Sequence, residues 1–355
     1  MAAESFCQML VLSDARRRPP SLGTNATADV TTELRPLTER LLARMPGPRA
    51  RWIVYWALVP WLDSAANVLL DTGTRSATWE QGRTLLIVSD AALSFAVAIA
   101  VWGTRRIARS LETIPARTWS SLEGGRHEEF RGVNSVSGPI VASVATALAF
   151  GIGTLVADGW LSGLLRGATW FILGITLWTF LWTYASLALG LDRLGRARLV
   201  PQTGPADPTL GLRPVGRVAF MGFWIVLAVL IPVVLTGLPG VVGVSIGGFV
   251  LAGALAAFFL SLLRLHRGMA EVKVDELTFA RELYAGAYEP VRADATLGTL
   301  ERQGDALAAA DALEKRAQAV REWPMDQGTV AWLIAITTGV IAFTIARLIQ
   351  TLLGS

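Results

Sequence analysis

The feature that most constrains the fold of this chain is a series of apolar blocks, each close to the length of a membrane-spanning helix. An α-helix rises by about 1.5 Å per residue, so about 20 apolar residues cross the ~30 Å hydrocarbon core of a bilayer. Of the 355 residues, 52% are hydrophobic and 17% are charged, whereas about a quarter of the residues of a soluble domain are charged. The blocks therefore predict an all-α, multi-pass transmembrane helical bundle.

Seven segments have the length and the hydropathy of a transmembrane helix. In chain order they cover residues 52–70, 85–102, 140–156, 168–189, 218–235, 241–263 and 330–349. Only helices and closed barrels satisfy the backbone hydrogen bonds in lipid, and the length of these segments indicates helices. We therefore predict seven spans.

Arginine and lysine alternate between rich and poor in the segments that separate these spans. From the N-terminus to the last span the counts are 8, 2, 6, 1, 5, 0 and 9. Positive residues concentrate in the cytoplasmic segments of membrane proteins. The alternation predicts that the N-terminus lies inside and the C-terminus outside.

The segments outside the spans predict the remaining organisation of the chain. Residues 1–30 have the composition of a disordered cytoplasmic tail. Residues 31–51 are expected to form an amphipathic basic helix, which either lies on anionic inner-leaflet lipids or packs on other cytoplasmic elements. A six-helix transmembrane region follows at 52–263. A cytoplasmic helical hairpin is expected at 264–329, with one helix stopped by Pro290 and the next beginning at Asp305, and the seventh span with a short tail occupies 330–355.

Arginine supplies almost all of the positive charge. Of 32 basic residues, only Lys273 and Lys315 are lysines, and alanine, glycine and leucine are abundant. This composition is typical of GC-rich bacterial genomes. It predicts a plasma membrane protein of a bacterium, embedded in the lipid bilayer of the cytoplasmic (inner) membrane.

Several functional classes lack their sequence signatures. The chain has no P-loop, no H-E-x-x-H and no G-x-S-x-G motif. Its single cysteine, Cys7, makes an intrachain disulfide impossible and a cysteine-rich metal site implausible. His127 beside Glu128 and Glu129 is a weak metal signal because adjacent residues do not share a helix face. We therefore expect no enzyme activity, no cofactor, no metal site and no nucleic-acid partner.

Polar residues within the spans are the strongest candidates for a functional site. Charged side chains in a span cost about 2.5–3.5 kcal/mol on insertion scales, so they usually face the bundle interior and serve a function. Given the predicted orientation, five such residues gather in the outer half of the bilayer: Asp63, Asn67, Asp90, Asp158 and Arg347. They are consistent with an ion pathway, with a proton shared between carboxyl groups, with neutralisation by Arg347, or with a hydrogen-bonded clamp that has no transport role.

Small residues at intervals of four suggest close helix packing. The sixth predicted span carries Gly243, Gly247 and Gly248, and the third carries Gly151 on one face with Ser143 and Ala147. These faces could meet within one chain or between subunits, and packing within one chain is the expectation.

The intramembrane acids favour an ion channel or an ion-coupled transporter as the function. The alternative is a non-transporting membrane sensor or scaffold that binds a cytoplasmic protein partner through its inner helices. A membrane enzyme that acts on lipid is the third and weakest hypothesis, because the inner segments carry few catalytic residue types. The pattern is also compatible with a homo-oligomer.

Overall fold

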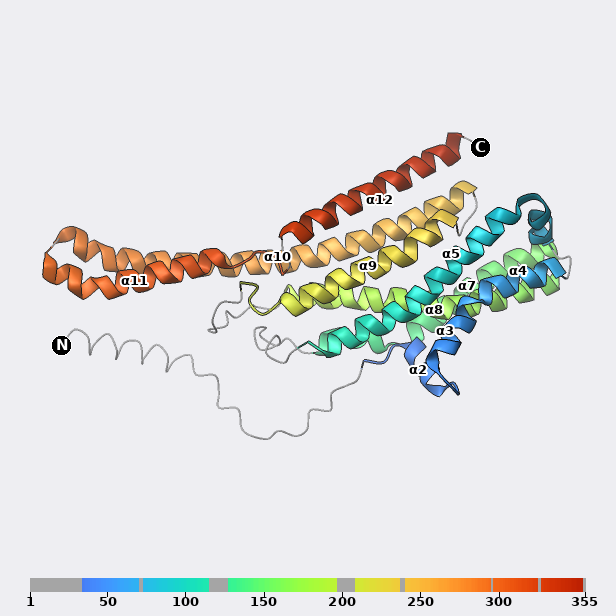
Figure 1. Ribbon diagram of the computed structural model, residues 1–355, viewed down its shortest axis with the longest axis horizontal. Helices are drawn as coiled ribbons and strands as arrows, with labels where there is room; N and C mark the ends of the chain where they lie inside the picture. The colour runs from blue at the N-terminus through green and yellow to red at the C-terminus, as the bar shows by residue number, and fades with distance from the viewer. Residues whose placement is uncertain are drawn as a thin grey trace. The chain divides into compact units, whose positions relative to one another are not determined.

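The chain is helical in every element that the structure describes (Figure 1). The computed structural model describes residues 34–69, 73–114, 127–196, 208–236, 240–294, 296–324 and 327–353. The elements are α2 (Leu37–Arg44), α3 (Arg49–Ala57), α4 (Val59–Leu69), α5 (Gly73–Glu112), the 3₁₀ helix η1 (His127–Asn134), α7 (Ser137–Asp158), α8 (Trp160–Leu194), α9 (Arg213–Thr236), α10 (Gly240–Ala293), α11 (Leu297–Ala319) and α12 (Gln327–Leu353). The predicted all-α class is confirmed.

Among the described residues, five helices are long and apolar enough to cross a membrane. They are Leu86–Glu112 in α5, Ser137–Asp158, Trp160–Leu194, Arg213–Pro232 in α9 and Gly248–Ala293 in α10. By length and composition the chain is therefore a helical membrane protein. The count of seven spans and the orientation of the termini stay predictions.

The first predicted span, 52–70, consists of two shorter helices rather than one. The helix α3 ends at Ala57, α4 begins at Val59, and Leu58 lies between them. The Leu58 N–H donates to the carbonyls of Val54 and Tyr55 at 3.0 and 3.2 Å. Because Pro60 has no N–H to donate, the regular helical ladder cannot continue through it.

The helix α8 begins at Trp160, so the predicted outer loop at 157–167 is wrong. Gly159 alone separates α7 from α8, and its φ of 94° lies in the left-handed region that glycine adopts at no steric cost. The two helices then pack closely. A Cβ on Gly151 would lie 3.2 Å from the Gly163 oxygen and 3.2 Å from the Gly167 Cα. This close packing occurs within one chain.

The bundle core forms where α5, α8, α9 and α10 meet. Its fully buried members include Ile107 of α5, Leu187 of α8, Phe223 of α9 and Phe258 of α10. The ring of Phe130, from η1, is also fully buried and lies against Gly190 of α8, where a Cβ would come within 2.3 Å of it. The core thus joins four long helices and one short element near their ends.

The basic segment predicted at 31–51 is divided between α2 and the start of α3. The helix α2 begins at Leu37, after the extended Pro36, and not at residue 31. Leu34, Leu37 and Leu42 are buried, and the Leu34 N–H donates to Glu112 Oε1 of α5 at 2.7 Å. These leucines therefore pack on other protein elements, and contact of the segment's arginines with inner-leaflet lipids stays a prediction.

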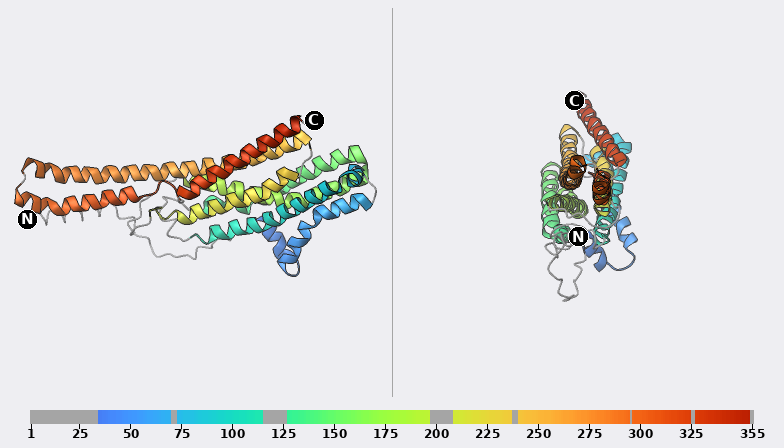
Figure 2. Two further views of the ribbon diagram at one scale, coloured as in Figure 1. Left: turned by 45° about the horizontal axis from the view of Figure 1, so that its top comes forward. Right: turned by 90° about the vertical axis from the view of Figure 1, so that its left-hand side faces the viewer.

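The helices α10 and α11 lie side by side in both views (Figures 1 and 2). The helix α10 is 54 residues long and passes through Pro290 to Ala293, so the predicted stop at Pro290 is wrong. The helix α11 begins at Leu297 after Thr296, eight residues before the predicted start at Asp305. Ala280 and Ala287 of α10 and Ala310 and Ala317 of α11 are buried between them.

The α7–α8 contact yields a test with two matched substitutions. Gly163→Ala adds a methyl group 2.5 Å from the Leu155 Cβ and 2.9 Å from the Gly151 oxygen. We expect overpacking to destabilise the protein by about 1–3 kcal/mol, measured by thermal unfolding in detergent. In contrast, Gly153→Ala meets no atom within 4 Å and should stabilise by about 0.5–1 kcal/mol. Equal effects would contradict the close contact.

Candidate functional site

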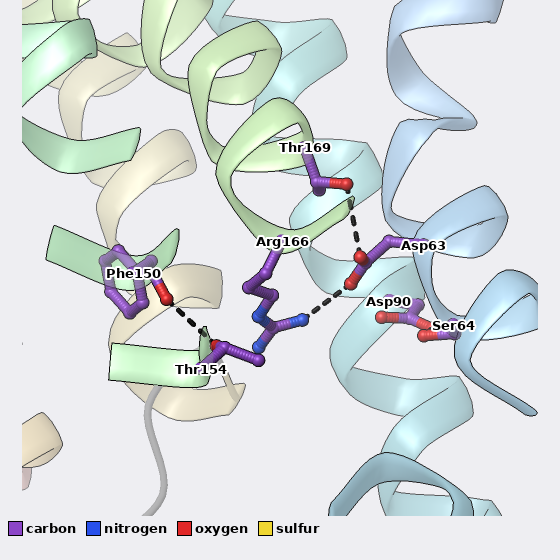
Figure 3. A network of polar contacts seen from close by, with 7 residues as sticks. All are labelled: Asp63, Ser64, Asp90, Phe150, Thr154, Arg166 and Thr169. Atoms are coloured by element: carbon purple, nitrogen blue, oxygen red, sulfur yellow. Dashed lines mark hydrogen bonds and ion pairs between the residues drawn. The ribbon is translucent and has the colours of Figure 1, made fainter. Parts of the chain in front are cut away.

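Polar side chains from α4 and α8 meet inside the bundle at Asp63 (Figure 3). Arg166 Nη1 lies 2.5 Å from Asp63 Oδ2, and Thr169 Oγ1 donates to Asp63 Oδ1 at 3.1 Å. Asp63 is only 5% exposed. Both carboxylate oxygens therefore accept hydrogen bonds from α8, and one of these bonds is assisted by the full charge of a guanidinium group.

A second carboxylate lies next to the first. The Ser64 hydroxyl of α4 donates to Asp90 Oδ2 of α5, and Asp90 is 2% exposed. Because Ser64 follows Asp63 directly, one turn of α4 holds a carboxylate that contacts α8 and a hydroxyl that contacts α5. We name the five residues Asp63, Ser64, Asp90, Arg166 and Thr169 the polar cluster.

The polar cluster lies a similar distance along the helices from two tryptophans. Asp63 follows Trp52 by eleven residues and Asp90 precedes Trp102, which is 55% exposed, by twelve. At about 1.5 Å per residue, these separations are about 16 and 18 Å.

Arg166 is linked to α7 through Trp170, as well as to α4 through Asp63. Its guanidinium carbon lies 6.0 Å from the ring centroid of Trp170, and that ring stacks on Phe150 of α7 at 4.1 Å. Figure 3 places Thr154 and Phe150 of α7 on the side of Arg166 that is opposite to Asp63. The guanidinium group thus connects α4 with the α7–α8 pair.

An apolar cluster borders the polar cluster on the same helices. Leu93 and Val97 of α5 and Leu173 of α8 are buried together, and Trp56 and Val59 pack against them. Leu93 follows Asp90 by one turn, and Leu173 follows Thr169 by one turn. This apolar cluster therefore lies between the polar cluster and the level of Trp102 in α5.

The structure brings together two of the five predicted intramembrane residues. Asp63 and Asp90 lie in the polar cluster, whereas Asp158 is the last residue of α7 and takes no part in it. The side chains of Asn67 and Arg347, and the surroundings of Gly243 and Gly247, lie outside the described residues. Gly248 lies in α10 and is half-buried.

The cation that pairs with Asp63 is Arg166, which lies two residues before the predicted start of the fourth span. Hydropathy windows end at charged residues, so the fourth span was predicted to begin at residue 168, just after Arg166. A signal was nevertheless present. Trp160, Leu161, Leu164 and Leu165 continue the apolar pattern of the helix back across Arg166.

The donor groups of the polar cluster hydrogen-bond to carboxylate oxygens of Asp63 or Asp90. Within the described residues, no group of three or more histidine, cysteine, aspartate or glutamate side chains could hold a metal ion. The cluster provides one positive charge and two hydroxyl donors to carboxylates inside the bundle.

Comparison with known proteins adds no assignment: the sequence matches no protein-family model, no curated protein and no solved structure. The function is therefore argued from the polar cluster and from the helices that carry it.

The ion pair can be tested by a double-mutant cycle. Arg166→Ala leaves the buried Asp63 carboxylate without its charged partner and should destabilise by about 3–5 kcal/mol, whereas Asp63→Ala leaves the partly exposed Arg166 and should cost less. The double variant should lose less than the sum of the two, because no charge is left unpaired. Thr169→Val, which removes one neutral hydrogen-bond donor, should cost about 1–2 kcal/mol. Unfolding in detergent measures all four, and strictly additive losses would contradict the pairing.

Proposed function

We propose that the chain is an ion-coupled membrane transporter in which the polar cluster is the site that changes state during transport. The observation that carries this proposal is that two buried carboxylates are held by donors from neighbouring elements: Asp63 pairs with the partly exposed Arg166, and Asp90 accepts from Ser64, the residue after Asp63. Charges inside spans are costly and usually functional. A buried ion pair adds little net stability compared with apolar residues of similar size. If the polar cluster served only to hold the helices together, leucine or phenylalanine side chains could give the same stability without burying charge.

The contacts favour a gated transporter over an open channel. Both oxygens of Asp63 are occupied by α8, and the apolar cluster of Leu93, Val97 and Leu173 borders the site. Channel filters present carbonyl oxygens or charged side chains to the passing ion, whereas apolar constrictions close pores by dewetting. These contacts therefore support a closed state within this proposal.

The transport step follows from competition for Asp63. When a proton or a monovalent cation neutralises Asp63, the attraction of Arg166 for that carboxylate is lost. Arg166 can then turn toward Asp90, and α4 is released from α8. Because Ser64 binds Asp90, the release of α4 also shifts the α4–α5 contact. One binding event thereby changes how three helices pack.

The finer membrane topology belongs to the same proposal. We place seven spans in a bacterial cytoplasmic membrane, with the N-terminus inside, on the alternation of basic residues between the connecting segments. The hairpin of α10 and α11 then lies in the cytoplasm, where anionic inner-leaflet lipids face the arginines near the helix ends.

A second candidate function is a membrane sensor or scaffold. It is favoured by one observation: α10 continues out of the apolar region into the hairpin with α11, where Phe279, Leu283, Tyr284 and Tyr288 are exposed. Exposed aromatic and aliphatic side chains outside the lipid are typical of a protein interaction surface.

Ion flux into liposomes separates the two candidates. Purified protein should move protons or monovalent cations down an imposed gradient. Asp63→Asn should reduce the rate at least about tenfold, a barrier increase of about 1.4 kcal/mol. The matched control Asp311→Asn, on the exposed face of α11, should leave the rate unchanged. No flux of wild-type protein under any gradient would contradict transport and favour the scaffold.

The topology is tested by reporters fused to the intact chain. A reporter that is active only outside the cytoplasm should be active at Ser355 and inactive when inserted at Gly304, within α11. Activity at both positions or at neither would show that an even number of spans lies between them, contrary to the single span predicted there.

A further inference from the structure

Four exposed arginines lie on α5 and α9, two helices that run side by side (Figure 1). Arg106 and Arg109 belong to α5, and Arg213 and Arg217 belong to α9. Within the part of the chain that the structure describes, none of these four side chains makes an ion pair or a hydrogen bond. We name the four residues the arginine cluster.

Contacts between α5 and α9 show that the two helices are antiparallel. A Cβ on Gly103 of α5 would clash with the Ile225 side chain of α9. Two turns later in α5, Ser110 Oγ lies 3.9 Å from the sulfur of Met221, which comes one turn earlier in α9. Residue numbers therefore rise along α5 where they fall along α9, and Ser110 and Met221 mark one level of the pair.

This register brings arginines of the two helices close together in level. Arg109 is next to Ser110 and so lies at about the level of Met221. Arg217 precedes Met221 by four residues, which places it about 6 Å further along at 1.5 Å per residue. The other two members of the arginine cluster each lie about one turn beyond these.

The arginines of both helices also lie on the same side of the pair. In α5, Arg109 comes one position before Ser110, which faces α9. In α9, Trp224 comes one position before Ile225, which faces α5, and Arg217 lies two turns before Trp224 on the same face. Because the helices are antiparallel, a step of one residue back along the chain turns both of them toward the same side.

The opposite side of the pair is covered by α8. A Cβ on Gly222 of α9 would lie 2.8 Å from the Leu187 side chain of α8 and 4.0 Å from the Ile107 side chain of α5. The side that carries the arginine cluster faces away from α8 and is exposed. In a helical membrane protein, this outer side faces lipid.

Two exposed tryptophans and an apolar surface adjoin the arginine cluster. Trp102, which is 55% exposed, comes one turn before Arg106, and Trp224, which is 40% exposed, comes two turns after Arg217. Phe95 continues the same face of α5 away from the arginines and is 53% exposed. Tryptophan concentrates where hydrocarbon meets the headgroups. The outer face thus changes from apolar residues through tryptophan to arginine, in the order that a phospholipid presents its acyl chains and its headgroup.

Other arginines at this end of the bundle are paired with carboxylates. Asp192 of α8 pairs with Arg196 at 2.7 Å and with Arg264 of α10 at 2.6 Å. Glu39 of α2 lies 3.7 Å from Arg105 of α5. The described residues supply no such acid to the arginine cluster, so its charge is left for an anion from outside the chain.

We propose that the arginine cluster, with Trp102 and Trp224, binds the headgroup of an anionic phospholipid whose acyl chains lie along the apolar outer face of α5 and α9. Arginine suits this ligand because its planar guanidinium group forms paired hydrogen bonds with phosphate oxygens. Arg109 and Arg217 lie on neighbouring helices about one turn apart in level, so one phosphate contacts both. The bound lipid then connects α5 with α9. The proposal is independent of whether the bundle transports ions and of which terminus lies inside.

Native mass spectrometry of the full-length protein in nonionic detergent tests the site. Titration with phosphatidylglycerol should give tighter binding than titration with phosphatidylcholine. Arg109→Gln with Arg217→Gln should weaken phosphatidylglycerol binding at least about tenfold, since each arginine near the membrane surface contributes about a factor of five toward anionic lipid. Equal binding of the two lipids by the wild-type protein would overturn the proposal.

A matched control removes the same charge elsewhere. Arg196→Gln with Arg264→Gln lowers the net charge by the same amount, but at arginines that Asp192 already pairs. We expect this variant to keep the preference for phosphatidylglycerol. Equal losses in the two double variants would show that only net charge matters and would overturn the site.

Lysine substitutions separate charge from a structural role of the arginines. Arg109→Lys with Arg217→Lys keeps both charges but loses the paired hydrogen bonds, so it should weaken phosphatidylglycerol binding less than the glutamine variant does. A lysine variant as weak as the glutamine variant would show that charge does not hold the lipid, contrary to the proposal. Circular dichroism checks that each variant is folded.

Inorganic phosphate distinguishes a lipid from a free anion. In molar excess it should displace little phosphatidylglycerol, because it has no acyl chains to contact the apolar face. Phosphatidylglycerol should also raise the thermal unfolding midpoint of the wild-type protein more than phosphatidylcholine does, since a ligand that binds the folded state stabilises it. That difference should vanish in the glutamine variant. Displacement by phosphate, or an equal rise with both lipids, would overturn the assignment to lipid.

Discussion

The contact of Asp63 with Arg166 and Thr169 is the interaction on which the position of α4 in the apolar bundle depends most. In hydrocarbon, every polar group must find its partner within the protein. Several hydroxyl groups of the bundle do so locally, by donating to the carbonyl four residues earlier in the same helix. Thr104, Ser143, Thr183 and Thr337 all bond in this way. A carboxylate cannot, because it has no proton to donate and the N–H groups of its own helix are already bonded. Asp63 and Asp90 therefore require donors from neighbouring helices, and those donors determine how α4 lies against α5 and α8.

The packing of α7 on α8 supports the contact between Asp63 and Arg166 from the side of α8 that faces α7. Gly163 and Gly167, which flank Arg166 in α8, allow the two backbones to approach closely. Phe150 of α7 stacks on Trp170, one turn beyond Arg166. The guanidinium group is thus carried by a rigid pair of helices, whereas Asp63 is carried by α4, a short helix that follows a break. The acidic partner is therefore the more movable one.

Much of this could be predicted from the sequence, because hydropathy and helical period report on lipid exposure directly. The all-α class follows from them, and the depth of Asp63 and Asp90 predicted that they lie close together. The wrong predictions concern where helices begin and end. Those positions depend on single residues, whose effect is lost when hydropathy is averaged over a window. Arg166 interrupts the apolar run of α8 without ending the helix. Pro290 is tolerated in α10, because its ring lies at an exposed position and only one backbone donor is lost. Pro60 has the opposite effect and coincides with the division of the first predicted span.

The length of α10 has a mechanical consequence. A single helix of 54 residues joins the bundle core at Phe258 to the tip of the hairpin at Ala293. The part beyond Arg264 is about 45 Å long at 1.5 Å per residue. Such a helix acts as a lever arm with its fulcrum at the bundle. A tilt of about 10° within the core would carry the tip through about 8 Å, with the length taken from the same rise per residue. Small changes in helix packing inside the lipid would thus move the tip of the hairpin by several ångströms. A displacement of that size is enough to make or break contacts with another molecule.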